Sequence, residues 1–180
     1  MTRLVTRGLL AIGMAAIVAA CTTGRAAEDE LKVGDPAPEF KLQGSDGKMH
    51  SLSEYKGKSA VVLAWFPKAF TPGCTKQCTS YGKDNKELKT LNVKYFTVSV
   101  DPHEKNTKFA QSVGADYPIL SDPDRKAAEQ YGVLNVTGLA KRWTFYIDKD
   151  GVIREIDKSV NPASAAPDTV TKVKALGLDD

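Results

Sequence analysis

Short apolar runs alternate with longer polar segments along most of the chain. Residues 60–66 (AVVLAWF) are apolar at every position, which is typical of a strand buried on both faces of a sheet. Residues 93–100 form a second long run, rich in Val, Tyr, Phe and Thr, which also favours a strand. Shorter runs predict further strands at 40–43, 49–52, 117–120, 142–147 and 152–156.

The polar segments between these runs carry helix signals. The longest predicts a helix over about 74–91. Asp101 and Glu104 flank Pro102 in the arrangement of a capping box, and this predicts a helix that ends near Gly114. Two further helices are predicted at 124–131 and 167–176.

The order of these elements indicates the fold class. Asp46-Gly47 and Asp150-Gly151 are turn signals, and each joins two neighbouring predicted strands into a hairpin. Strands that alternate with helices and end in an antiparallel hairpin favour an α/β domain with a mixed sheet and helices on both faces. This order is typical of the thioredoxin-like fold, here with an additional N-terminal β-hairpin.

The start of the chain has the pattern of an export signal. Arg3 and Arg7 give a basic head to the apolar run 8–20, which is within the length of signal peptides and short for a transmembrane helix. The run ends Val-Ala-Ala-Cys, which resembles the lipobox of bacterial lipoproteins, with Cys21 as the lipid-bearing N-terminus. Cleavage after Ala26, which would release a soluble periplasmic protein, is the alternative.

We therefore expect a signal peptide at 1–20, a tether at 21–30 and one domain at 31–180. In the lipoprotein reading, acyl chains on Cys21 hold the protein in the bacterial cell envelope, facing the periplasm. Arg3 and Arg7 also supply two of the 25 basic residues.

Composition excludes several classes of function. Without the signal peptide, 23 basic residues face 22 acidic ones, so a net charge of about +1 gives no reason to propose nucleic acid or an anionic membrane surface as a partner. The sequence holds neither a dinucleotide-binding glycine motif nor a phosphate-binding loop. No cofactor is expected.

Cys74 is the residue with the clearest chemical signal. It lies where the apolar run 60–66 and a loop hand over to a predicted helix, and free amide hydrogens and the helix dipole stabilise a thiolate there. An unperturbed thiol is only about 3% ionised at pH 7, so a reactive site also needs a cation and a hydroxyl. Thr71, three residues earlier, can provide the hydroxyl.

The residues around Cys74 also resemble a known family. Pro67, Thr71 and Cys74 match the Pro-x-x-x-Thr-x-x-Cys signature of peroxiredoxins, and the surrounding FPKAFTPGCTKQ looks most like the bacterioferritin-comigratory-protein (PrxQ-like) subgroup. The likeness spans most of the domain and includes the segments 33–40, 120–124 and 145–151.

This resemblance implies a thiol peroxidase that reduces hydrogen peroxide and organic hydroperoxides. Cys74 would be the peroxidatic cysteine, which attacks the peroxide and becomes a sulfenic acid. Thr71 and Arg142 would polarise the peroxide and hold the thiolate, and Pro67 would shield the site from water. A helix cap remains the alternative role for Thr71, and a surface strand cation for Arg142.

Cys78 is the candidate resolving cysteine. On an intact helix, its Cβ and that of Cys74 would be about 5–6 Å apart, whereas a disulfide needs about 3.8 Å, so bonding requires the first helical turn to unwind. The subgroup often carries its second cysteine one position later, and a buried bystander thiol is the alternative. A disulfide would need a dithiol reductant, which in the envelope points to an exported thioredoxin-like protein.

Two functions from other classes remain open. A Sco-type copper chaperone also has two cysteines with three residues between them, but it needs a histidine just before the 143–147 strand, where this chain has Lys141 and Arg142. A thiol-disulfide oxidoreductase typically has two residues between its cysteines. A zinc site would lack ligands, so no metal is expected.

Overall fold

The computed structural model describes residues 30–82 and 86–180. The predicted signal peptide, the lipidation site Cys21 and the tether up to residue 29 lie outside these residues. Within the described residues, no helix is long and apolar enough to cross a membrane.

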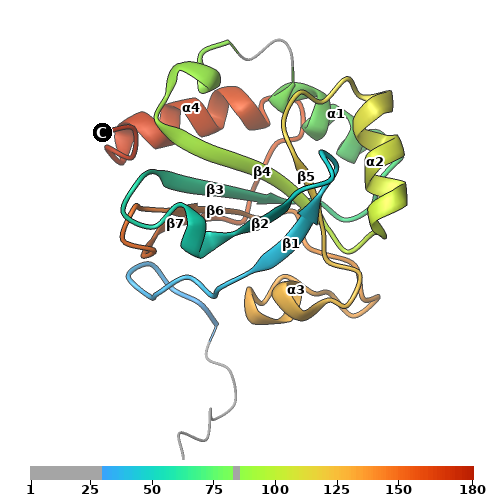
Figure 1. Cartoon of the computed structure of the whole chain (residues 1–180), viewed down its shortest axis with the longest axis horizontal. Helices are drawn as coiled ribbons and strands as arrows, with labels where there is room; N and C mark the ends of the chain where they lie inside the picture. The colour runs from blue at the N-terminus through green and yellow to red at the C-terminus, as the bar shows by residue number, and fades with distance from the viewer. Residues whose placement is uncertain (1–29, 83–85) are drawn as a thin grey trace, which may run out of the picture.

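A seven-stranded sheet in the order β2-β1-β5-β4-β3-β6-β7 runs through the middle of the fold (Figure 1). The pairs β3–β4 and β4–β5 are parallel, and all other neighbours are antiparallel, which confirms the predicted mixed sheet with its N-terminal hairpin. The strands are β1 (Lys41–Gly44), β2 (Met49–Ser51), β3 (Ala60–Trp65), β4 (Val93–Ser99), β5 (Ile119–Ser121), β6 (Thr144–Ile147) and β7 (Ile153–Asp157).

Helices cover both faces of this sheet, as predicted. Buried side chains of α1, α2 and α4 share one core cluster, whereas those of α3 belong to a second cluster on the opposite face (Figure 1). The helices are α1 (Pro72–Tyr81), α2 (His103–Ser112), α3 (Lys126–Gln130) and α4 (Ala165–Ala175), with 3-10 turns at Leu52–Glu54 and Leu88–Thr90.

Strand β3 contributes side chains to both core clusters. Val62 and Ala64 pack into the cluster of α1, whereas Leu63 and Trp65 pack into the cluster of α3. Both faces of the strand are buried, so no polar position alternates with the apolar ones. This explains the uninterrupted apolar run in the sequence, and it fixes the direction in which β3 delivers the chain to α1.

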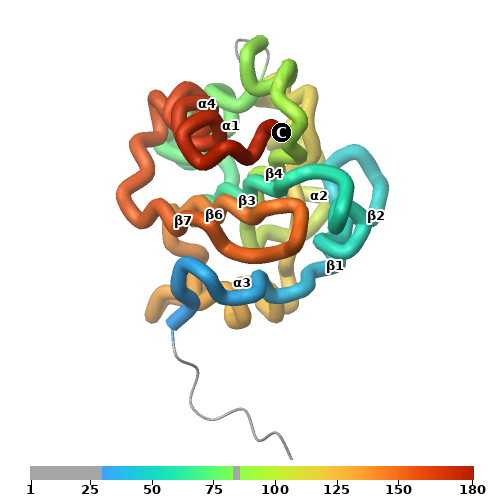
Figure 2. The backbone as a smooth tube through the Cα atoms, turned by 90° about the vertical axis from the view of Figure 1, so that its left-hand side faces the viewer, coloured from blue at the N-terminus to red at the C-terminus, as the bar shows by residue number. Residues whose placement is uncertain are grey.

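The first described residues lie along the edge strand β7. The amide of Gly34 donates a hydrogen bond to the carbonyl oxygen of Ile153 at 2.8 Å, and Pro36 forms a bridge with Val152. Figure 2 shows this segment in blue, alongside the β6–β7 hairpin. It covers an edge that would otherwise offer free backbone groups.

The prediction of one helix over 74–91 is wrong at its C-terminal end. α1 ends at Tyr81, with Gly82 as its C-terminal cap, and the chain resumes in a 3-10 turn at 88–90. Glycine is a poor helix former, and Leu88 is fully buried in the core cluster of α1 and α4. The polar pattern continues past Gly82 and did not reveal that the helix ends there.

The predicted capping box before α2 does not form. Pro102 is the N-cap residue and no side chain caps the helix, although the helix itself lies where it was predicted. The Asp101 carboxylate points inward, toward the loop that precedes α1.

Candidate active site

Cys74 lies at the start of α1, beyond the carboxyl end of β3. Thr71 is the N-cap residue, and Pro72 occupies the first helical position, where its fixed φ favours helix initiation. Cys74 is the third residue of the helix, among the amide groups that a helix start leaves unpaired, and its side chain is 1% exposed. The helix therefore begins where the sequence predicts, with the positive end of its dipole at this sulfur.

Sheet topology brings Arg142 to this cysteine from 68 positions along the chain. β6 pairs antiparallel with β3, with Thr144 opposite Ala64, so the residues just before β6 lie beside the end of β3. The Nη2 of Arg142 donates a hydrogen bond to the Sγ of Cys74 at 3.4 Å. Gly73 leaves room for this contact, because a Cβ there would lie 3.2 Å from the same Nη2.

Lys141, the neighbouring cation, points elsewhere. Its Nζ donates to the carbonyl oxygen of Gly132 at 3.2 Å and lies 4.5 Å from the centroid of the Trp143 ring. The cation beside Cys74 is therefore Arg142.

Gln77 is a residue of this site that sequence reasoning missed. It is fully buried one helical turn after Cys74, where its Oε1 accepts a hydrogen bond from the Nη1 of Arg142. Its Nε2 donates to the carbonyl oxygen of Trp65 at 3.3 Å. Gln77 thereby fastens the guanidinium group to the end of β3. Spacing of three residues places it on the helix face of Cys74, but a glutamine in a polar helix gives no sign of burial.

Thr71 and Pro67 also lie in the segment between β3 and α1. The Thr71 hydroxyl donates a hydrogen bond to the carbonyl oxygen of Lys68 at 3.0 Å, and its side chain does not cap the helix. Its oxygen lone pairs are left to accept a hydrogen bond from another molecule. Pro67 is half-buried directly after Phe66.

The buried carboxylate of Asp101 stabilises the segment between β3 and α1. The Oδ2 of Asp101 accepts hydrogen bonds from the amide of Ala69 at 2.8 Å and from the hydroxyl of Ser99 at 3.0 Å. Its Oδ1 forms an ion pair with Lys105 at 2.5 Å. Asp101 is a second residue that the sequence reading missed, because its position before Pro102 suggested a helix cap.

Cys78 is buried one turn further along α1, in the same core cluster as Cys74. Its Sγ donates a weak hydrogen bond to the Oγ1 of Thr97 at 3.7 Å, and both cysteines are free thiols. Burial raises the pKa of the Cys78 thiol to about 12, and side-chain hydrogen bonds with Thr97 and Tyr117 oppose this with a smaller effect. Cys78 is therefore a neutral thiol in this conformation.

This environment predicts slow alkylation of Cys78 in the reduced protein. A thiol whose pKa is raised to about 12 stays protonated at pH 8, and the thiolate is the reactive form. We expect iodoacetamide at pH 8 to label Cys78 at least tenfold faster in 8 M urea than in buffer, followed by peptide mass spectrometry. Equal labelling rates in the two conditions would contradict the buried, neutral state.

The described residues offer no obvious metal centre near the cysteines. Within residues 30–82 and 86–180, no group of three or more His, Cys, Asp or Glu side chains lies in a metal-binding arrangement. His50 instead contacts Asp46 and Tyr55, each at 3.1 Å, and His103 lies on α2.

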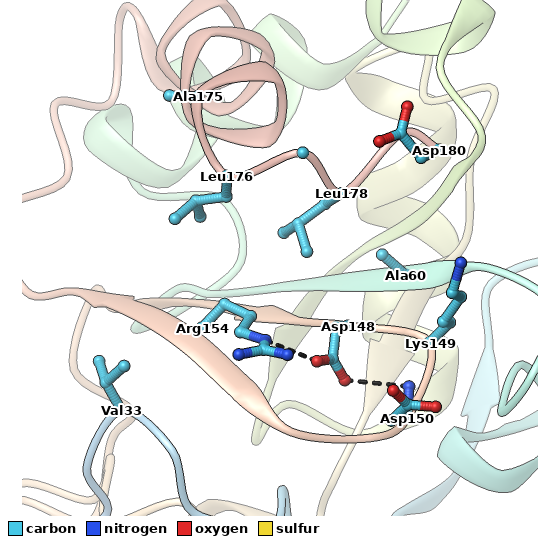
Figure 3. Close-up of a pocket in the computed structure, with 11 residues that line it drawn as sticks. Val33, Ala60, Asp148, Lys149, Asp150, Arg154, Ala175, Leu176, Leu178 and Asp180 are labelled. Carbon is cyan, nitrogen blue, oxygen red and sulfur yellow. Dashed lines mark hydrogen bonds and ion pairs between the residues drawn. The ribbon is translucent and has the colours of Figure 1, made fainter.

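A cleft of about 510 Å³ lies at the opposite end of β3, where the strand begins at Ala60 (Figure 3). Its most polar feature is Asp148, whose carboxylate pairs with Arg154 at 2.6 Å and accepts hydrogen bonds from the amides of Asp150 and Val152. These bonds close the β6–β7 turn that the Asp150-Gly151 signal predicts. The cleft lies between this turn and the residues at the end of α4, 175–180, and neither cysteine lines it.

Comparisons with known proteins match the chain to a family. The family model described as AhpC/TSA matches residues 33–156. The peroxiredoxin Bcp of Escherichia coli is 35% identical over 133 residues, which cover 70% of this chain and 85% of that protein.

Solved structures agree with this match. The peroxidoxin BcpB from Mycobacterium tuberculosis is 32% identical, with a TM-score of 0.73, over 81% of this chain and 98% of that one. A mutant of PrxQ from Xylella fastidiosa, 23% identical, shares the fold with a TM-score of 0.75 over 83% of this chain and 99% of its own. The predicted thioredoxin-like fold is confirmed.

Proposed function

Since this chain belongs to the AhpC/TSA family, as a peroxiredoxin of the Bcp/PrxQ subgroup, we propose that Cys74 is its peroxidatic cysteine. The protein is a thiol peroxidase, and this replaces the copper-chaperone and oxidoreductase alternatives. The observation that carries the assignment is the hydrogen bond from the Nη2 of Arg142 to the Sγ of Cys74 at 3.4 Å.

In the first step, the Cys74 thiolate attacks one oxygen of the peroxide. A sulfur–oxygen bond forms as the oxygen–oxygen bond breaks, the sulfur is oxidised to a sulfenic acid, and the leaving oxygen takes a proton and departs as water or alcohol. Arg142 is suited to stabilise both the thiolate and the charge that develops on the leaving oxygen. Gln77 keeps the guanidinium group in place for both tasks.

Thr71 and Pro67 complete the proposed peroxide site. Because the Thr71 hydroxyl donates a hydrogen bond to the carbonyl oxygen of Lys68, its lone pairs can accept a hydrogen bond from the peroxide O–H and orient the molecule toward the sulfur. The half-buried ring of Pro67 helps to exclude water, which strengthens the interactions of Arg142.

In the second step, Cys78 resolves the sulfenic acid. The Cys78 sulfur attacks the Cys74 sulfur, the disulfide forms, and the hydroxyl of the sulfenic acid leaves as water with the thiol proton. The intact α1 keeps the two Cβ atoms too far apart for a disulfide, so the first turns of the helix unwind and release Cys78 from the core. Exposure to water also removes the burial that raises the pKa of Cys78.

Peroxide treatment of the reduced protein is therefore expected to produce a Cys74–Cys78 disulfide. One equivalent of hydrogen peroxide, alkylation and proteolysis with an enzyme that does not cut after Lys76 should yield a peptide that contains both cysteines, carries no alkyl group and is 2 Da lighter than the same peptide with two free thiols. A stable sulfinic acid on Cys74 with an unmodified Cys78 thiol would instead make this a one-cysteine enzyme. Cys78→Ser, which cannot form the bond, is the matched control.

A dithiol reductant completes the cycle by reducing the disulfide, and an exported thioredoxin-like protein suits an envelope location. That location depends on Cys21, which we propose to be the lipid-bearing N-terminus of a lipoprotein. The lipobox-like residues before Cys21 and the basic, apolar segment at 1–20 support this anchor.

Labelled palmitate tests the anchor. Cells that express the full chain should incorporate the label into this protein, and Cys21→Ser should abolish incorporation. Label that persists in Cys21→Ser, or wild-type protein recovered without label from the soluble periplasmic fraction, would support cleavage elsewhere.

A further inference from the structure

Phe70 combines two unfavourable features at the edge of the proposed site. Its φ of 66° lies in the left-handed region that side chains with a Cβ rarely adopt, and its side chain is 53% exposed. Among residues 30–82 and 86–180, Arg125 is the one other residue besides glycine with a positive φ. A strained backbone that also exposes an aromatic ring persists only where the surroundings enforce it, and such strain clusters at functional sites.

Three contacts stabilise the left-handed backbone conformation of Phe70. The amide of Ala69 is bonded to the Asp101 carboxylate at 2.8 Å, and the Thr71 hydroxyl is bonded to the carbonyl oxygen of Lys68. The ring of Phe70 lies edge-on to the ring of Phe109, with centroids 5.1 Å apart. The segment is therefore anchored both before and after Phe70, and the ring has a defined place.

The Phe70 ring lies at the surface and packs on the core cluster to which Cys74 belongs. Phe109 belongs to the core cluster that contains Cys74 and Phe66, and its ring lies 5.8 Å from that of Phe66. The Phe70 ring packs on the outer side of Phe109, half exposed to solvent. Through Phe109, the exposed Phe70 ring is therefore packed against the core cluster that contains Cys74.

The exposed Phe70 ring lies where the organic part of a bound hydroperoxide would leave the site. The reacting oxygen must reach the buried Cys74 sulfur beside Arg142, so the organic part of a hydroperoxide has to extend outward from the site. Hydrogen peroxide has no organic part and gains nothing from an apolar wall. An apolar substituent that contacts a ring in the transition state raises the rate constant for organic substrates alone.

We propose that Phe70 determines peroxide specificity by contacting the apolar part of organic hydroperoxides. The proposal rests on the proposed function, in which Cys74 reacts with the peroxide. It also differs from a role for Phe70 in docking the reductant, which would affect only the later, reductive half of the cycle.

The test is single-turnover oxidation of the reduced protein in the absence of reductant, followed by stopped-flow fluorescence. Cumene hydroperoxide and hydrogen peroxide are compared for wild type, Phe70→Ala, Phe70→Gly and Phe70→Leu. We expect the ratio of the two rate constants, cumene hydroperoxide over hydrogen peroxide, to fall about fivefold to twentyfold in the alanine and glycine variants. The leucine variant, which keeps an apolar side chain, should retain most of the ratio.

The glycine variant separates the ring from the strain, because glycine adopts a positive φ freely. Met49→Ala, which removes a side chain that is 47% exposed on β2, is the matched control and should keep the wild-type ratio. An unchanged ratio in Phe70→Ala overturns the proposal. This holds also if the variant turns over more slowly with a protein dithiol, because that result would assign Phe70 to docking of the reductant. Wild-type protein that reacts with neither peroxide would instead contradict the proposed function.

Discussion

Replacement of Cys74 by serine is expected to reduce peroxide consumption to the rate of the uncatalysed reaction with the reductant. A serine hydroxyl stays protonated at neutral pH, and its oxygen cannot take up the peroxide oxygen as sulfur does in a sulfenic acid. Serine and cysteine side chains are nearly equal in size, so serine fits the buried position of Cys74 in α1. The measurement is the loss of hydrogen peroxide over time with excess dithiothreitol.

A matched control removes a thiol outside the catalytic site. Cys21→Ser is expected to consume peroxide at the wild-type rate in the same assay, since Cys21 lies in the proposed lipid-bearing segment. Circular dichroism establishes that each variant is folded. Wild-type turnover in a folded Cys74→Ser protein would show that another group reacts with the peroxide.

Replacement of Arg142 by alanine is expected to lower the second-order rate constant for peroxide reduction by about 10²–10³-fold. The variant loses the one cation that contacts the Cys74 sulfur within the described residues. It also leaves the buried Oε1 of Gln77 without its partner. Stopped-flow oxidation of the reduced protein measures this constant without interference from the reductant.

Lys141→Ala is the matched control for this prediction. Lys141 carries the same charge one residue away, but it contacts the Gly132 carbonyl oxygen and the Trp143 ring. We expect its rate constant to stay within about twofold of wild type, as for a partly screened surface charge. Arg142→Lys should recover little activity, because an ammonium group lacks the fork that reaches Gln77 and Cys74 together. An unchanged rate constant in Arg142→Ala would mean that the thiolate is stabilised by other groups.

The parts of the site that were predictable from the sequence are those with a local chemical signal. Cys74 was predicted to lie at a strand-to-helix transition, with the hydroxyl of Thr71 three residues before it. Arg142 was placed by resemblance to a family, and the antiparallel pairing of β6 with β3 gives the physical reason for its position.

The parts that were missed depend on tertiary contacts. From the sequence, Gln77 looks like a surface residue of a polar helix. Its burial becomes clear only in the fold, where its amide forms hydrogen bonds with Arg142 and the Trp65 carbonyl oxygen. Asp101 matches a helix cap, but the Ala69 amide and the Ser99 hydroxyl offer its carboxylate buried partners. The end of α1 was misplaced because the polar pattern continues past Gly82, the C-terminal cap of the helix.

The most direct test of the central claim is to trap the product of the first step. Reduced Cys78→Ser protein is treated with one equivalent of hydrogen peroxide in the presence of dimedone, which reacts with sulfenic acids, and its peptides are analysed by mass spectrometry. The account predicts a dimedone adduct on the peptide that contains Cys74, in an amount equal to the peroxide consumed. Peroxide consumption that leaves Cys74 unlabelled and unoxidised would contradict it.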